Sequence, residues 1–295
     1  MDAEKIEALD LRYGESGRIH ETADGEPMYY ELRGEGPTLT FVSTIYVMAT
    51  AWRNFTGELV RRNRILTYDL RNQGASVEAP ARFSQHVEDL RHLLDDLGVE
   101  RTYLVGSSIS TLICRDFAVA HPDRVSGLVL TGPSISPWGK GRRKRIVRSW
   151  LAALEADGAQ GLFDLIYPIV FGDKLVAEGR GATYLALRER FLAINSKAQL
   201  AENLEASLEA SDEVDLLGRL SCPTLLIVGD DDFTASRGAA LEMMRLIGRG
   251  RVDVFSECGH LPYFEATDRF ESSVQEFVAA VEGGTLAEPP EERLL

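Results

Sequence analysis

Short apolar runs alternate with amphipathic segments along most of the chain. The apolar runs predict buried strands over residues 38–43, 64–70, 103–105, 125–130, 223–228 and 251–255. Apolar residues spaced three and four apart predict helices over residues 51–62, 83–97, 112–117, 239–247 and 268–281. Residues 18–23 and 28–32 alternate around Asp24-Gly25, which predicts a β-hairpin.

This order of elements predicts the fold class. Strands that alternate with helices favour right-handed crossovers, and these give an α/β fold whose mostly parallel sheet has helices on both faces. The hairpin adds two antiparallel strands at one edge, so we expect eight strands in total.

The interval 134–217 interrupts the alternation. It contains no strand pattern and predicts several helices rich in Ala, Leu, Glu and Arg, inserted between two strands as a lid over the sheet. We therefore divide the chain into a core of residues 1–133 and 218–282 and a helical lid of residues 134–217. Residues 283–295 are rich in proline and glutamate and predict a disordered tail, and the polar residues 1–16 are expected to be frayed.

Composition narrows the set of partners. The chain has 295 residues, and its net charge of −14 disfavours nucleic acids and anionic membranes as partners. Three widely spaced cysteines predict neither a disulfide framework nor a zinc site, and no phosphate-binding loop is present, so we expect no metal or cofactor. The charged N-terminus lacks an apolar signal segment, and no apolar run reaches the length of a membrane span, which predicts a soluble cytoplasmic protein.

Residues 102–117 carry the first candidate for chemistry. They predict a strand, a sharp turn and a helix, and two serines lie in the turn. Such a turn needs small residues two positions before and after the serine that it exposes. Ser108 has Gly106 and Ser110 at these positions, whereas Ser107 has two bulky β-branched residues, so sterics favour Ser108.

The turn resembles the nucleophile elbow G-x-S-x-G of the α/β-hydrolase family, with Ser110 in place of the last glycine. Three further stretches, within a likeness that extends over residues 15–282, are similar to the family: Tyr68-Asp-Leu-Arg-Asn-Gln-Gly-Ala-Ser76, Pro223-Thr-Leu-Leu-Ile-Val-Gly229 and Gly259-His-Leu-Pro-Tyr-Phe-Glu265. The resemblance implies an α/β-hydrolase fold with a serine nucleophile.

Two further strand ends supply the partners that a serine nucleophile needs. Three aspartates follow the strand at 223–228, and His260 follows the strand at 251–255. The order serine, acid, histidine matches the family, whose acid stands three residues after the glycine, and this implies Asp232. His260 would take the proton of Ser108, and Asp232 would orient His260.

The expected oxyanion hole departs from the family. One N–H should come from Ile109, directly after the nucleophile, and the other from Ile45. The family's His-Gly pair before this second donor is replaced by Ser43-Thr44, which restricts the backbone and removes a bracing histidine. Either hydroxyl could support the loop or donate in its place.

A basic cluster opens the lid at Arg142, Arg143 and Arg145. Such a cluster is typical of a solvated helix face, or of a dock for an anionic group such as a substrate carboxylate, a CoA thioester or an acyl-carrier protein.

We therefore expect a serine hydrolase that cleaves a carboxylic ester or thioester of a small-molecule acyl substrate. Two alternatives stay open at this stage. One is an acyl-transferring or cyclising tailoring enzyme of natural-product biosynthesis on the same fold. The other is a non-catalytic ligand-binding homologue, suggested by the altered oxyanion loop. Substrate identity, the acyl acceptor and the oligomeric state are not predicted.

Overall fold

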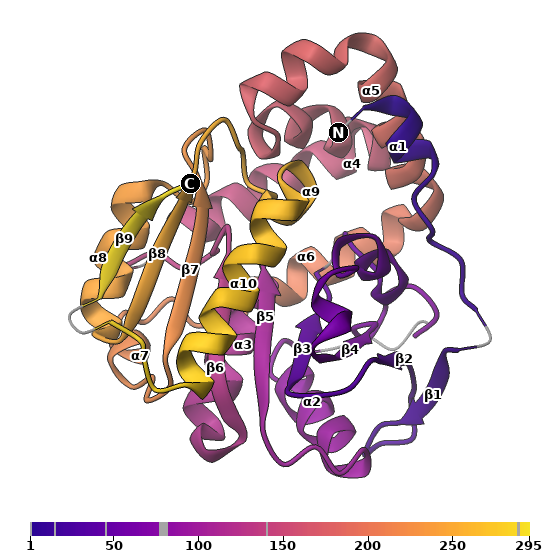
Figure 1. Cartoon of the computed structure of the whole chain (residues 1–295). Coiled ribbons are helices and arrows are strands. Elements are labelled where there is room, and N and C mark those ends of the chain that lie inside the picture. Colours follow the sequence, from indigo (N-terminus) through magenta and orange to yellow (C-terminus); the bar gives the residue numbers. More distant parts are fainter. Residues whose placement is uncertain (1, 15, 45, 77–81, 140, 288–289) are drawn as a thin grey trace.

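The computed structural model describes residues 2–14, 16–44, 46–76, 82–139, 141–287 and 290–295. Within these residues one sheet has nine strands in the order β1-β2-β4-β3-β5-β6-β7-β8-β9 (Figure 1). The strands are β1 (Arg18–Glu21), β2 (Pro27–Arg33), β3 (Thr38–Val42), β4 (Arg64–Tyr68), β5 (Thr102–Ser107), β6 (Val125–Thr131), β7 (Thr224–Gly229), β8 (Gly250–Phe255) and β9 (Glu291–Leu294). Strand β2 pairs antiparallel with β1, as the hairpin predicts, and also with β4, whereas the other neighbouring strands pair in parallel.

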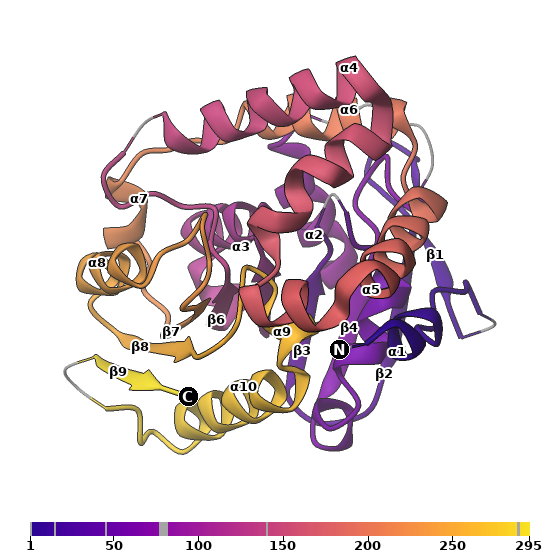
Figure 2. The ribbon, with the colours of Figure 1, turned by 90° about the horizontal axis from the view of Figure 1, so that it is seen from above.

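Helices cover both faces of the sheet. Figure 2 shows α10 on one face and α2 and α3 on the other. The helices of the core are α2 (Gln85–Asp96), α3 (Ser110–Ala120), α7 (Asp215–Gly218), α8 (Arg237–Ile247), α9 (Pro262–Glu265) and α10 (Thr267–Glu282), with short 3₁₀ helices η1 (Ala49–Phe55), η2 (Leu59–Arg61) and η3 (Pro122–Arg124). Strands β3, β5, β7 and β8 are buried along their whole length, because both faces of a parallel sheet are covered. The α/β class with a mostly parallel sheet is confirmed.

The ninth strand corrects the predictions of eight strands and a disordered tail over 283–295. β9 pairs in parallel with β8, and the Leu295 N–H donates to the Val254 carbonyl at 2.8 Å. Its side chains are polar because it forms the edge of the sheet, where they remain largely exposed and pair with charges on neighbouring elements. This composition is similar to that of a disordered segment. Residues 288–289 lie outside the described part of the chain.

Residues 134–217 contain no strand in their described part, and they hold α4 (Arg142–Val170), α5 (Asp173–Ile194), α6 (Lys197–Ser207) and the start of α7. Helix α4 bends at Asp157 and Gly158, whose backbone angles are not helical. Figures 1 and 2 show α4 and α5 stacked beyond one end of the sheet. These helices share a cavity with the loops that follow β3, β5 and β8, so they cover the carboxyl ends of the strands.

The N-terminal arm, residues 2–14, packs against the rest of the protein. The prediction that it is frayed was wrong for these residues. Helix α1 (Ala3–Glu7) lies against α5, and its Ile6 is fully buried (Figure 1). Arg53 of η1 forms ion pairs with Asp10 and with the buried Glu31, which fixes the arm to the core. The arm is therefore a wall of the fold. Among the described residues, none of the helices combines the length and apolar character that a membrane span needs.

Candidate active site

The turn between β5 and α3 holds Ser108 in a strained conformation. The φ angle of Ser108 is +52°, in the left-handed region that non-glycine residues rarely adopt. A Cβ at Gly106 would lie 2.7 Å from the Cys114 sulfur, so glycine is required there. Ser110 fits at the last position of the motif because its hydroxyl folds back, accepting from the Ser107 N–H at 2.8 Å and donating to the Ser107 carbonyl at 2.9 Å.

A hydrogen-bonded chain joins Ser108, His260 and Asp232. His260 Nε2 lies 2.9 Å from Ser108 Oγ, and His260 Nδ1 lies 2.8 Å from Asp232 Oδ2. All three residues are buried, and they follow β5, β8 and β7. The tautomer that satisfies this chain carries the proton on Nδ1, which donates to Asp232 and leaves the Nε2 lone pair facing the Ser108 hydroxyl.

The charges of the pair support each other. Burial favours the neutral form of both His260 and Asp232. In each residue this effect is outweighed by the charge and hydrogen bond of the partner. The Asp232 charge and hydrogen bond, with Glu265, raise the pKa of His260 above its ordinary value. The His260 charge and two backbone N–H groups lower the pKa of Asp232. Asp232 therefore remains a carboxylate that stabilises protonated His260.

The acid is further fixed by Thr234, which the sequence analysis missed. The Thr234 hydroxyl donates to Asp232 Oδ1 at 2.9 Å, and the same oxygen accepts from the N–H groups of Thr234 and Ala235 at 2.7 and 2.9 Å. A threonine two residues after an aspartate is the signal for such a turn. Asp230 and Asp231 accept instead from backbone N–H groups of residues 258 and 173.

Of the two expected oxyanion donors, Ile109 and Ile45, the structure describes Ile109. In the described part of the chain, the Ile109 N–H donates to no protein acceptor, so it is free for a ligand oxygen. Ile45 lies outside the described residues. Ser43 and Thr44 are both buried, and their hydroxyls find no partner among the described residues. Thr44 also lines the same cavity as Ser108.

Gln73 braces the turn that carries Ser43 and Thr44. The turn closes through the Val47 N–H, which donates to the Thr44 carbonyl at 3.0 Å. The Gln73 amide donates to the carbonyls of Thr44 and Val47, the second at 3.2 Å, and its oxygen accepts from the Leu70 N–H at 3.2 Å. Gln73 thus braces a loop that lacks the family's histidine. The only sequence signal was its place in the stretch Tyr68–Ser76.

Two cavities meet at Ser108 and His260. The larger, about 150 Å³, lies between the core and the inserted helices. Its walls are almost wholly apolar: Leu9, Leu11, Val47, Phe55, Trp150, Phe163, Ile166, Val170, Phe171, Leu187, Phe191, Ile194, Leu261 and Phe264. Leu9 and Leu11 come from the N-terminal arm, and Arg190 is the one charged residue in the described lining of this cavity besides His260. The smaller cavity, about 50 Å³, is more polar and includes Ser134, Thr234 and Arg142.

The three predicted anion-docking arginines separate in the structure. Arg142 lines the smaller cavity and donates to the Phe233 carbonyl at 2.8 Å. Arg143 is buried and fully engaged: it pairs with Asp212 at 2.8 Å and donates to two backbone carbonyls. Arg145 is exposed and lines neither cavity. Arg142 and Arg143 both line the smaller cavity, but the guanidinium of Arg143 is already bonded to residues 207–212, which it holds to the start of α4.

The histidine loop is tied to the inserted helices. The His260 N–H donates to the Val170 carbonyl at 2.7 Å. Glu265 accepts from the N–H groups of Gly172 and Gly259 at 2.9 and 3.1 Å, and its burial raises its pKa to about 7. Movement of the end of α4 would therefore shift the backbone of His260. Glu265 stood in the stretch around His260, but its role could not be inferred without the insertion in place.

A serine–histidine–aspartate chain on strand-end loops of a mostly parallel sheet defines an α/β hydrolase. A family model described as "Alpha/beta hydrolase family" matches residues 40–272, and the chain belongs to this family.

Similar proteins cover most of the chain. A 2-hydroxy-6-oxononadienedioate/2-hydroxy-6-oxononatrienedioate hydrolase of Klebsiella pneumoniae is 27% identical over 91% of this chain and 94% of its own length. The structure of a hydrolase from Pseudomonas aeruginosa is 25% identical with a TM-score of 0.79, covering 91% of this chain and 100% of that one. A thermophilic esterase from Thermogutta terrifontis, at 24% identity, has a TM-score of 0.80 over 90% of this chain and 98% of its own.

Proposed function

We propose that the protein hydrolyses a carboxylic ester or thioester with an apolar acyl group, through an acyl-enzyme on Ser108. The observation that carries this proposal is the contact of Ser108 Oγ with His260 Nε2 at 2.9 Å, beside a cavity with apolar walls. The relatives and the fold support a hydrolase. The bond that is cleaved and the acyl group are our inference.

In the proposed reaction Ser108 Oγ attacks the carbonyl carbon while its proton passes to His260 Nε2. The negative charge on the carbonyl oxygen is stabilised by the Ile109 N–H, with Ile45 N–H or the Thr44 hydroxyl as the second donor. The tetrahedral intermediate then expels the alcohol or thiol, which takes the proton from His260. Water, deprotonated by His260, attacks the acyl-enzyme and releases the acid.

The two cavities suggest how the substrate lies. An apolar acyl chain fits the larger cavity, where burial of each CH₂ contributes about 0.8 kcal/mol. The leaving group then faces Ser134, Thr234 and Arg142, which can hydrogen-bond a polar or anionic group. A CoA thioester or an acyl-carrier protein would present its phosphate on this side, and the insertion over residues 134–217 would act as the lid.

A second candidate is hydrolysis of a carbon–carbon bond next to a ketone. The Klebsiella relative is named for a substrate with a carboxylate at each end. Arg190 lines the larger cavity and Arg142 the smaller one, so a cation is available on each side of Ser108. Ser108 Oγ would attack the ketone carbon while its proton passes to His260. The carbon–carbon bond would then break, the leaving carbanion would take that proton from His260, and water would hydrolyse the acyl-enzyme as in the first proposal.

One set of assays separates these candidates. Purified protein is mixed with p-nitrophenyl esters of two to twelve carbons, with acyl-CoA, and with a 2-hydroxy-6-oxo-dienoate whose conjugated absorbance is lost on cleavage. Ester turnover that Ser108→Ala abolishes and Ser149→Ala, in an exposed serine of α4, leaves unchanged supports the first proposal. Preference for the dienoate by tenfold or more in kcat/KM assigns the second.

Product analysis addresses the acyl acceptor. Mass spectrometry of the released acyl group distinguishes the free acid from a lactone or a transferred ester, which would mark a cyclising or acyl-transferring enzyme. Absence of turnover on every substrate, with ligand binding retained, would instead favour the non-catalytic homologue.

A further inference from the structure

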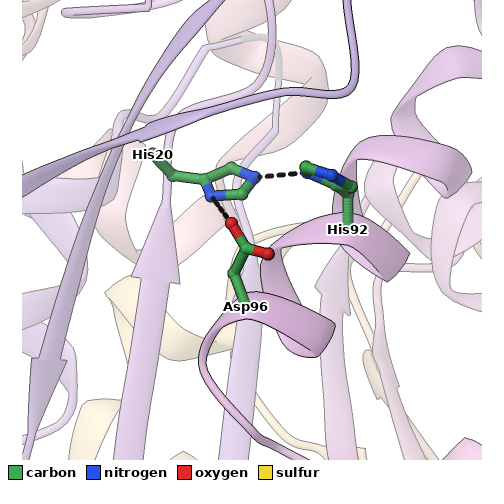
Figure 3. A group of neighbouring side chains, drawn as sticks. All are labelled: His20, His92 and Asp96. Carbon is green, nitrogen blue, oxygen red and sulfur yellow. Dashed lines mark hydrogen bonds and ion pairs between the residues drawn. The ribbon is translucent and has the colours of Figure 1, made fainter.

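Two histidines and an aspartate meet away from the catalytic site. His20 lies on β1, whereas His92 and Asp96 lie one turn apart on α2 (Figure 3). His20 Nε2 is 3.1 Å from His92 Nδ1, and His20 Nδ1 is 3.1 Å from an Asp96 carboxylate oxygen. The ligand atoms of the three side chains all lie within 4.8 Å of one another. None of the three lines either cavity at Ser108.

The hydrogen bonds orient His20 as in many metal sites. Asp96 accepts the Nδ1 proton of His20, so the lone pair on Nε2 faces His92. A carboxylate on the far nitrogen of a metal-binding histidine fixes its tautomer and raises its basicity. Two imidazole nitrogens at about 2.1 Å from one zinc ion in tetrahedral geometry lie about 3.4 Å apart. The observed 3.1 Å therefore allows a shared ion after a small movement.

Nearby carboxylates attract a cation to the two histidines, and one side of the cluster is open to solvent. The carboxylates of Asp96, Asp89 and Glu21 attract positive charge at His20, whereas its burial disfavours a charge on the ring itself. Asp89 also pairs with Arg71 at 2.6 Å. His20 is buried, but the Asp96 side chain is 55% exposed. Water can thus reach the pair and complete the coordination of an ion.

We propose that His20 Nε2 and His92 Nδ1 bind a divalent transition-metal ion of the zinc type, with Asp96 holding His20 from behind and water filling the remaining positions. The ion would replace the proton now shared between the two rings and join the edge strand β1 to α2. Imidazole suits zinc, copper and nickel better than magnesium or calcium. This inference is independent of the reaction at Ser108, and its role would be to stabilise the sheet edge.

Tag-free protein, first treated with a chelator, tests the proposal by thermal unfolding with increasing free Zn²⁺ and by competition with a zinc indicator dye. At free zinc one hundred times the dissociation constant, we expect the unfolding midpoint to rise by about 3–6 °C, with one zinc bound per chain. Magnesium at the same concentration should give no shift.

Variants decide whether the ion binds at this place. His92→Ala should abolish the zinc-dependent shift, and Asp96→Asn should weaken zinc binding by about 10–100-fold. Asp95→Asn is the matched control. Asp95 directly precedes Asp96 on α2, but it pairs with Arg91 and Arg124 and not with His20. If His92→Ala lowers expression, His92→Gln replaces it. An equal zinc shift in wild type and His92 variants, or no shift in any protein, overturns the proposal.

Discussion

Gln73 holds the loop of Ser43 and Thr44, where the second oxyanion donor is expected. Gln73 joins three backbone groups: it donates to the carbonyls of Thr44 and Val47 and accepts from the Leu70 N–H. Gln73 as a residue is only 6% exposed, so water cannot replace these bonds easily. Gln73→Met keeps the length and approximate volume of the side chain and removes all three hydrogen bonds.

The size of the effect follows from the groups left without partners. An unsatisfied buried polar group costs about 1–3 kcal/mol, and the Thr44 carbonyl retains the Val47 N–H as a donor. We therefore expect Gln73→Met to lower the free energy of unfolding by about 2–4 kcal/mol. Complete loss of an oxyanion donor costs about 10²–10³-fold in kcat. Because the loop is loosened and not removed, we expect kcat to fall about 10–100-fold with KM changed by less than threefold.

The assay is ester hydrolysis at a temperature well below the unfolding midpoint of the variant, measured beside denaturant unfolding. Gln275→Met is the matched control. Gln275 lies on α10, accepts a hydrogen bond from the Asn63 side chain at 2.7 Å, and lines neither cavity at Ser108. The control should lose stability and retain kcat. If Gln73→Met keeps kcat within threefold of wild type, or if both variants lose kcat equally, Gln73 does not position the loop.

Three further predictions concern the base, the cavity and the inserted helices. In the proposed reaction neutral His260 is the base, and its pKa is raised, so kcat/KM should rise with pH with a midpoint above 6.5. Asp232→Asn should lower this midpoint and reduce kcat about 10³–10⁴-fold; an unchanged pH profile would argue against the pair. Leu9→Trp should shift ester preference towards acyl chains shorter by two or more carbons. The same preference in wild type and variant would show that the N-terminal arm does not line the acyl cavity. Arg143→Met should destabilise the protein by about 3–5 kcal/mol in urea unfolding, and the exposed Arg142→Met by less than about 1 kcal/mol; equal losses would refute the structural role of Arg143.

Apolar periodicity predicted most of the fold because buried parallel strands and amphipathic helices leave strong patterns. The pattern does not reveal β9, since an edge strand exposes polar side chains, nor the packing of α1, whose single buried residue is Ile6. The segment 51–62 was predicted as one helix and forms two 3₁₀ helices instead. The spacing of Trp52, Phe55 and Leu59 gives an apolar face in either case.

The site divides in the same way. Residues in short motifs, such as Ser108 and His260, could be named from sequence because strand-end loops must bring them to one edge of a parallel sheet. Gln73 and Arg143 could not be placed, because their roles depend on backbone carbonyls that no sequence pattern marks. The pair His20 and His92 is separated by 72 positions along the chain, and only the packing of β1 on α2 brings them together.

The account stands on Ser108 being an activated nucleophile. The most direct measurement is labelling of the native protein with a fluorophosphonate, followed by peptide mass spectrometry to locate the adduct. The account predicts one adduct, on Ser108, whose rate of formation falls at least 100-fold in His260→Ala. No adduct under conditions that label a known serine esterase, or an adduct on Ser107 or Ser134 in place of Ser108, would contradict it.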